Sequence, residues 1–248
     1  MRGLGNLIWL ELKIFFREPM GAFGTVVAPV LVLMMFGRIG TRVLPRAQSA
    51  ATAFFTVDVP VFVAILIAIN AVASLVAIVS IYREGGILKR LSTTPLKPHT
   101  ILTAHVIVKL ILTAITLVLT FLLARNSILT QSKIPLASFM AAVLISTLSI
   151  LSLGFVIASI VPTARFAQPI TSIILYPMVA VSGLFIPLSS FSPTFIKVAH
   201  LMPLTYAVSL LQGIWRGQPW GAHVGDIFAL AAVFFFCTAL STRIFRWQ

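Results

Sequence analysis

Six apolar stretches constrain the fold of this chain more than any other feature of its sequence. A helix needs about 20 mainly apolar residues to cross the hydrocarbon core of a bilayer. Stretches that reach or nearly reach this length occupy residues 20–38, 58–82, 100–124, 135–161, 167–188 and 224–243. The sequence therefore predicts an all-α integral membrane protein with six transmembrane helices. Five spans plus a re-entrant piece is the alternative.

The composition agrees with a membrane protein and argues against a nucleic-acid-binding protein. Apolar residues make up 59% of the chain and charged residues 9%, against about 45–50% and about 25% in a soluble domain. The net charge of +13 does not indicate nucleic acid, because Lys and Arg are scattered at span ends rather than gathered into a stripe with aromatic residues. Basic residues at such ends suit anionic lipid headgroups. We expect membrane lipid, and no nucleic acid, as a partner.

The sequence offers little material for catalysis or for a bound cofactor. We place none of the five acidic residues in the middle of a span, so acid–base pairs and carboxylate metal cages lack groups. The histidines show no H-E-x-x-H spacing, and no G-x-x-x-x-G-K-[ST] pattern occurs, so we expect no ATP site in this chain. We therefore predict no catalytic residue, no metal and no cofactor held by the chain itself.

Six spans would put both termini on the same side of the membrane. Most Lys and Arg residues fall on that side, although Arg38, Arg42 and Arg46 lie on the other. The positive-inside rule then predicts a multi-pass protein of the plasma (inner) membrane with cytoplasmic termini.

The first residues, 1–18, have the pattern of a helix that lies in the membrane interface. Trp9 and Phe16 belong to an apolar arc of the helical circle, and Lys13 and Arg17 lie off that arc. A helix with such a division rests at the boundary of headgroups and acyl chains. An extension of the first span is the alternative, but the charges in this segment argue against its burial.

A few residues inside or beside the spans are candidates to line a pathway: Asn70, His105 and Phe185. Asn70 lies midway along the second span, where an amide either bonds to another helix or faces a substrate path. His105 lies in the third span and is either a packing residue or a switch. Both alternatives stay open for each.

A polar island, residues 82–100, separates the second and third stretches. Gly85 and Gly86 permit an abrupt turn there, and Pro95 and Pro98 prevent a helix from continuing into the next span. Between them the residues favour a short amphipathic helix outside the membrane. Such a helix can rest on lipid or insert into a groove of a partner protein, and the residues alone leave these uses equal.

A mixed segment, residues 184–218, follows the fifth stretch. Pro193, Pro203, Lys197 and Arg216 interrupt its apolar patches. Such a segment suits a broken or re-entrant helix, which a bilayer tolerates where protein buries the freed backbone groups. We expect re-entrant helices before the last span.

Three segments of the chain carry a shared pattern: the polar island, "FFREPMGAFGTVVAPVLVLMMFG" and "SGLFIPLSSFSPTFIKVAHLMPLTYAVSLLQGIWRG". Together they resemble the permease subunits of type-2 ABC exporters, particularly the drug-resistance-like branch. Members carry R-E-x-G-T-L-E/K-R-L-x-x-T-P-L between their second and third spans, and the two quoted segments resemble their interfacial helix with the first span, and their last third. Ile87 replaces a frequent Thr, and His105 replaces a frequent Lys or Arg. The residues that match the first motif, and that the resemblance makes candidates for contact with an ATPase, are Arg83, Glu84, Gly85, Gly86, Leu88, Arg90, Leu91, Thr94, Pro95 and Leu96.

The resemblance implies one transmembrane permease domain over residues 1–248 that pairs with a second permease copy, as a homodimer or with a similar chain. Each copy would bind a separate P-loop ATPase, which holds ATP and Mg. The loop at 83–99 would be the cytoplasmic coupling element, and 184–218 would lie on the extracytoplasmic side. The cargo would be hydrophobic or amphipathic, drug-like or lipid-like. Export of a polysaccharide or glycolipid is the alternative, and an ATP-independent carrier or channel is a weaker one.

Overall fold

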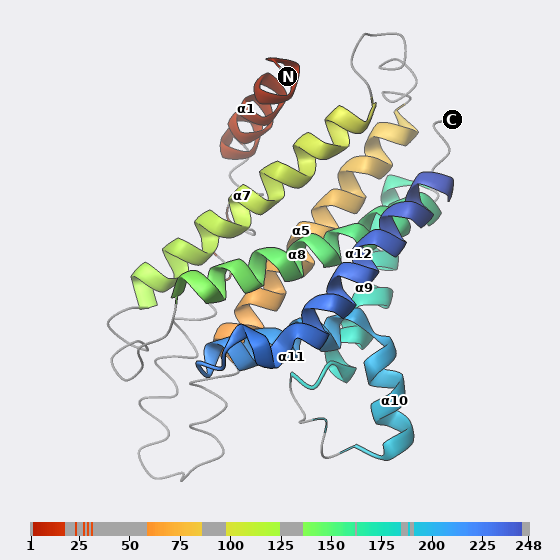
Figure 1. Cartoon of the computed structure of the whole chain (residues 1–248). Coiled ribbons are helices and arrows are strands. Elements are labelled where there is room, and N and C mark those ends of the chain that lie inside the picture. Colours follow the sequence, from red (N-terminus) through yellow and green to blue (C-terminus); the bar gives the residue numbers. More distant parts are fainter. Residues whose placement is uncertain are drawn as a thin grey trace.

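The computed structural model describes residues 2–17, 59–85, 98–124, 136–161, 163–184, 188 and 191–244, with isolated positions 23, 27, 29 and 31. Within these ranges the chain is helical and contains no strand (Figure 1). The helices are α1 (Arg2–Arg17), α5 (Val59–Glu84), α7 (Pro98–Ala124), α8 (Leu136–Ile160), α9 (Ala164–Val181), α10 (Pro193–Leu201), α11 (Pro203–Trp215), the 3₁₀ turn η5 (Trp220–His223) and α12 (Val224–Ile244).

Four of the described helices, α5, α8, α9 and α12, are long and apolar enough to cross a membrane. The pair α10 and α11 makes a fifth candidate if its two helices are counted as one broken span. Helix α7 has 27 residues, but its described apolar part, Thr103–Leu119, is shorter than a span. The predicted first span, 20–38, lies largely outside the described residues. The all-α membrane class is thus confirmed, and the number of six spans stays a prediction.

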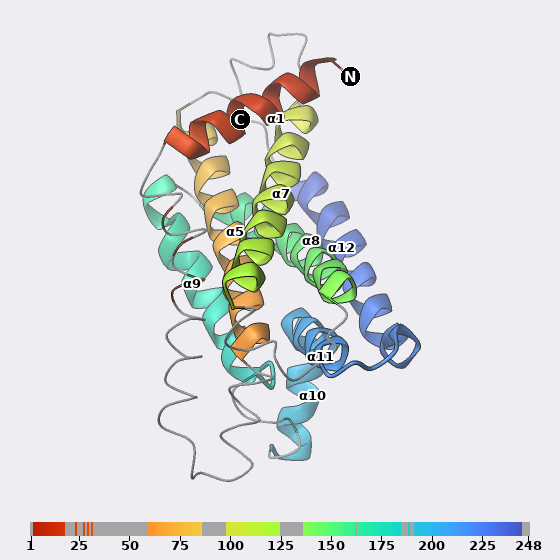
Figure 2. The same cartoon turned by 90° about the vertical axis from the view of Figure 1, so that its left-hand side faces the viewer.

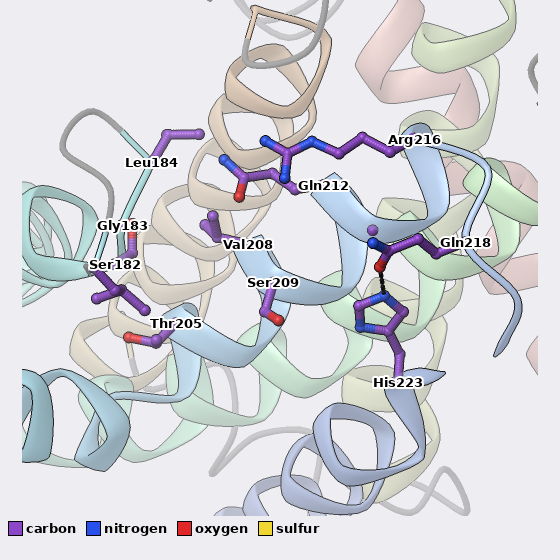
Figure 3. A pocket seen from close by; sticks show the side chains of 12 residues that line it. Ser182, Gly183, Leu184, Thr205, Val208, Ser209, Gln212, Arg216, Gln218 and His223 are labelled. Carbon is purple, nitrogen blue, oxygen red and sulfur yellow. Dashed lines mark hydrogen bonds between the residues drawn. The ribbon is translucent and has the colours of Figure 1, made fainter. Parts of the chain in front are cut away.

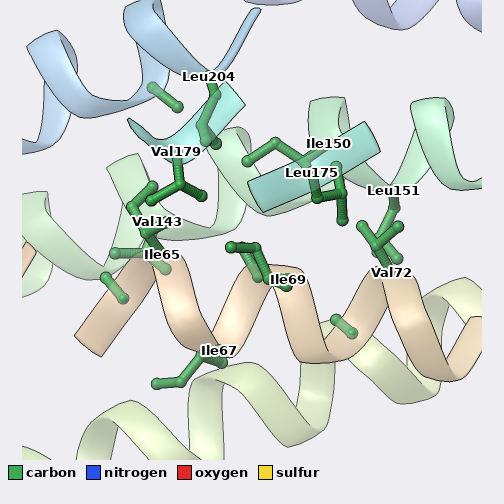
Figure 4. Packing of buried hydrophobic residues seen from close by; sticks show 14 of the residues in the cluster. Ile65, Ile67, Ile69, Val72, Val143, Ile150, Leu151, Leu175, Val179 and Leu204 are labelled. Atoms are coloured by element: carbon green, nitrogen blue, oxygen red, sulfur yellow. The ribbon is translucent and has the colours of Figure 1, made fainter. Parts of the chain in front are cut away.

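Helix α8 is the centre of the bundle and packs against α5, α11 and α12. On α5, Ile65, Ile69 and Val72 face aliphatic side chains of α8 and α9 (Figure 4). Gly154 of α8 permits this approach, because a Cβ there would lie 3.2 Å from the Val72 side chain. Small residues at such crossings let helices pack closely where lipid supplies no hydrophobic drive for association.

The helices give the bundle two distinct ends (Figures 1 and 2). At one end α5 and α8 finish, α7 and α9 begin, and α1 packs against α7; we call this the α1 end. At the other end lie α10, α11, η5 and the start of α12; we call this the α10 end. Helix α12 finishes at the α1 end, so the first and last described helices reach the same end of the bundle.

A sharp bend of 94° separates α10 from α11. Pro203 occupies the first turn of α11, where its missing N–H costs nothing. The Thr205 hydroxyl donates to the carbonyl of Ala199 (2.6 Å) and the Tyr206 hydroxyl donates to that of His200 (2.8 Å). The Ala199 carbonyl also accepts the Met202 amide at 2.9 Å, and the Tyr206 bond supplies a partner to the His200 carbonyl at the helix end. The predicted mixed segment is therefore a broken helix pair, as in a broken span or a re-entrant loop.

Candidate functional site

The charged pair at the end of α5 lies against the connection between α8 and α9. The Arg83 guanidinium donates from Nη1 to the carbonyls of Ala158 and Ser159, at 3.3 and 3.4 Å. These carbonyls belong to the last turn of α8, where the helix dipole is negative and a cation is stabilising. Arg83 thus attaches the end of α5 to the end of α8.

Glu84 makes the opposite contact with α9. Its Oε2 accepts a hydrogen bond of 2.8 Å from the backbone amide of Ala164, the first residue of α9. Thr163 precedes it and, within the described part of the chain, its side chain makes no capping bond. The carboxylate of Glu84 therefore takes the role of an N-cap, at the end of the helix where negative charge is favoured.

Arg83 and Glu84 together hold the turn between α8 and α9 by matching the dipoles of both helices; we call this contact the clamp. Gly85 is also described, and its amide donates to Ile81 at 2.9 Å, continuing the helical turn. The other candidate coupling residues lie outside the described residues: Gly86, Leu88, Arg90, Leu91, Thr94, Pro95 and Leu96. The clamp therefore marks where the loop leaves α5, at the α1 end.

Helix α1 is tied to α7 by one polar contact and one cation–ring contact. His105 Nδ1 lies 2.6 Å from Glu11 Oε2, an ion-pair distance without the alignment of a hydrogen bond. The Lys109 ammonium lies 6.0 Å from the centre of the Phe15 ring, a cation–π arrangement. Tyr82 of α5 packs beside the His105 ring, with 5.4 Å between ring centres. Glu11 is a contact that the sequence analysis did not identify.

The residues predicted to lie in the membrane interface are on the exposed face of α1, away from α7. Trp9 is 71% exposed and Phe16 65% exposed, and Lys13 and Arg17 are also exposed. The face toward α7 carries Glu11 and Phe15 instead.

The three candidate pathway residues have different surroundings. Asn70 is exposed midway along α5, and among the described residues its side chain has no hydrogen bond to another helix. His105 is 2% exposed and does not open onto a path in this conformation. Phe185 lies outside the described residues.

A polar pocket of about 320 Å³ opens at the α10 end, between the residues that follow α9, α11 and η5 (Figure 3). At one side of it His223 connects two side chains: its Nδ1 lies 2.8 Å from Asp226 Oδ2, and its Nε2 lies 2.8 Å from Gln218 Oε1. The Ser209 hydroxyl of α11 donates to the same Asp226 oxygen at 2.9 Å. This network joins α11 to α12. The sequence analysis missed it, although the i, i+3 spacing of His223 and Asp226 was a possible signal.

Gly213 makes room for the His223 ring. A Cβ at this position would lie 1.8 Å from His223 Nε2, a separation that no structure tolerates. The ring therefore occupies the space next to the α11 backbone. Among the described residues no group of three or more His, Cys, Asp or Glu could hold a metal ion.

The comparison with protein families decides the class of this chain. A family described as "ABC-2 type transporter" matches residues 3–215. The chain belongs to the ABC-2 type transporter family. The membrane domain of this family is a transporter permease component, and permeases of this family normally work with an ATPase partner.

Two curated relatives of this ABC-2 chain are both called Nodulation protein J. The protein from Neorhizobium galegae is 29% identical over 72 residues, which are 29% of this chain and 28% of the relative. The protein from Rhizobium meliloti (strain 1021) is 27% identical over 100 residues, which are 39% of this chain and 38% of the relative. Each match thus spans less than two fifths of the relative's own length.

Proposed function

We propose that this chain is the membrane-spanning permease subunit of an ATP-driven exporter, coupled to a separate P-loop ATPase through the loop at residues 83–99. The ATPase would hold ATP and Mg, and two permease copies would form the pathway between them. The observation that carries this proposal is the clamp, in which Arg83 and Glu84 contact α8 and α9 where the loop begins.

The clamp supplies a physical route from the loop to the spans. A displacement of the loop moves the end of α5, and Arg83 and Glu84 link that end to both helices of the α8–α9 turn. Helix α9 then runs to the α10 end, and the residues that follow it directly, Ser182, Gly183 and Leu184, line the polar pocket. A shift imposed at the α1 end would thus reach the opposite end through packed helices, as transitions between two discrete packings require.

Helix α1 supports this arrangement from the side. In the proposal it lies in the interface, with Trp9, Lys13, Phe16 and Arg17 toward lipid and headgroups. Its contact with His105 holds it against α7, so His105 would position α1 rather than line the pathway. The α1 end, with both termini, would be cytoplasmic, in a plasma (inner) membrane.

The cargo in this proposal is hydrophobic or amphipathic, drug-like or lipid-like. The exposure of Asn70 favours its placement on a pathway between two copies, because an amide facing lipid at mid-membrane is left without a hydrogen-bond partner. A polysaccharide or glycolipid is the second candidate cargo. The hydroxyl and amide groups at the α10 end support it, because such groups can hydrogen-bond to sugar hydroxyls.

The proposal is tested by purifying the full chain with a P-loop ATPase encoded beside it, in phospholipid nanodiscs. We expect the two to copurify, and the permease to change the rate of ATP hydrolysis. Charge reversal in R90E and a proline in L88P should abolish that change, while the matched variant R90K should retain it. If R90E and L88P change the rate of ATP hydrolysis as much as the unaltered chain does, the loop does not couple the permease to the ATPase. Transport by the chain alone, without ATP, would replace the proposal by a secondary carrier.

A further inference from the structure

We propose that the polar pocket at the α10 end binds the anionic head group, a phosphate or carboxylate, of an amphipathic molecule, with Arg216 as its charge partner. The interpretation of this ligand as the exported cargo rests on the proposed export function. The binding itself does not, and it can be tested on the chain alone.

The pocket combines one uncompensated cation with neutral polar groups. Among the described residues that line it, only Arg216 and His223 have ionisable side chains. The Arg216 guanidinium makes no ion pair within the described part of the chain. A guanidinium presents a planar fork of donors that matches a carboxylate or phosphate in a bidentate manner.

The second ionisable group does not compete with an incoming anion. His223 is held on one side by Asp226 and on the other by Gln218. Any charge on its ring is balanced by the Asp226 carboxylate, which also accepts from Ser209. The local excess of positive charge therefore belongs to Arg216.

The remaining lining suits a polar head with an apolar stem. The Arg216 and Gln212 side chains extend next to each other toward Leu184 (Figure 3). Ser182, Thr205 and Ser209 also line the pocket, but their hydroxyls donate to Val179, Ala199 and Asp226. The Arg216 guanidinium is therefore the group that donates to an anion, and Leu188 and Val208 contribute aliphatic walls. A volume of about 320 Å³ is at the lower end for ligand sites, so it accommodates a head group rather than a whole amphiphile.

The position of the pocket allows the head group and the apolar chain of a ligand to lie in different surroundings. It opens at the α10 end, opposite the clamp, where the bend between α10 and α11 interrupts the apolar surface. An amphiphile could place its head against Arg216 while its chain stays beside the bundle. With this arrangement, the pocket would distinguish ligands by the charge of the head group and not by the structure of the apolar chain.

The test uses a thiol in the apolar wall of the pocket. In a C237S background, L188C introduces one cysteine among the lining residues without altering its polar groups. The full chain is placed in phosphatidylcholine nanodiscs, and the rate of labelling by N-ethylmaleimide is measured with dodecyl phosphate, dodecylphosphocholine or dodecyl maltoside. We expect dodecyl phosphate alone to slow labelling. R216Q should raise the concentration needed about tenfold, because a hydrogen-bonded charge pair is lost.

Two matched variants complete the design. R165Q removes an exposed arginine at the other end of α9 and should leave protection unchanged, while R216K should keep part of it because the charge remains without the fork. Equal protection in R216Q, or protection by the maltoside and not by the phosphate, overturns the anionic ligand. Because this assay contains no ATPase, a failure of the proposed export function would leave its result intact.

Discussion

Glu84 and Ala164, 80 residues apart in the chain, meet at the α1 end, where the Glu84 carboxylate accepts the first amide of α9 at 2.8 Å. Beside it Arg83 reaches the last carbonyls of α8. Arg83 and Glu84, the first two residues of the loop motif, thus bind the ends of two helices of the same chain. This gives the motif a structural role that exists before any partner binds.

Removal of the Glu84 carboxylate should loosen the start of α9. We expect E84A to cost about 1 kcal/mol, the usual value of an N-cap, and to increase amide hydrogen exchange in the first turn after Thr163. T163A is the matched control, since its side chain makes no capping bond among the described residues. Similar exchange in E84A and T163A would contradict the role of Glu84 as the cap.

Removal of Glu11 should release α1 from α7. Glu11 Oε2 lies 2.6 Å from Nδ1 of the buried His105, so E11A removes the ion-pair contact between α1 and α7. We expect E11A to increase hydrogen exchange throughout α1 and to speed proteolysis after it. N6A alters an exposed residue of the same helix whose side chain makes no hydrogen bond within the described part of the chain and should increase neither. If N6A has the same effect as E11A, the Glu11–His105 contact does not hold α1.

An added methyl group at Gly213 should disrupt the pocket at the α10 end. The Cβ of G213A would overlap the His223 ring, and overpacking of this kind costs about 1–3 kcal/mol. We expect a lower melting temperature and loss of protection at the start of α12. For the control G225A, no described atom lies within 4 Å of the added Cβ, so stability should be unchanged or slightly raised. Equal melting temperatures in the two variants would show that His223 does not occupy the described position.

Replacement of Asn70 should lower the rate of transport without lowering the stability of the protein. N70L removes an exposed amide from the middle of α5, so we expect the melting temperature to hold or rise while the rate of ATP-dependent efflux into vesicles falls. N70Q keeps an amide and should retain more of the rate. Efflux by N70L at the rate of the unaltered chain would remove Asn70 from the pathway.

The order of helices was predictable because the length of an apolar stretch decides whether a helix can span a bilayer. The predicted stretches 58–82, 100–124, 135–161 and 224–243 correspond closely to α5, α7, α8 and α12. The fifth stretch was predicted to run from 167 to 188, whereas α9 begins at Ala164 and ends at Val181. Its end is set by Gly183, whose φ of 84° is a left-handed conformation that glycine adopts readily.

The site was predictable only in part. The motif singled out Arg83 and Glu84 as functional, but nothing near them in the sequence indicates the turn that they hold. Apolar spacing predicts the arc of α1, but it does not indicate that Glu11 faces another helix. Its partner lies on α7, which only the packed structure reveals.

By itself the sequence determined the all-helical membrane class, the polar loop after the second stretch and the break before the last span, because these follow from local composition and from glycine and proline. Only the tertiary structure decided which groups pair across the bundle: Glu84 with α9, Glu11 with His105, and His223 with Asp226 beneath Gly213. Such pairs depend on how helices cross. The crossing is set by packing over many residues, which no local pattern encodes.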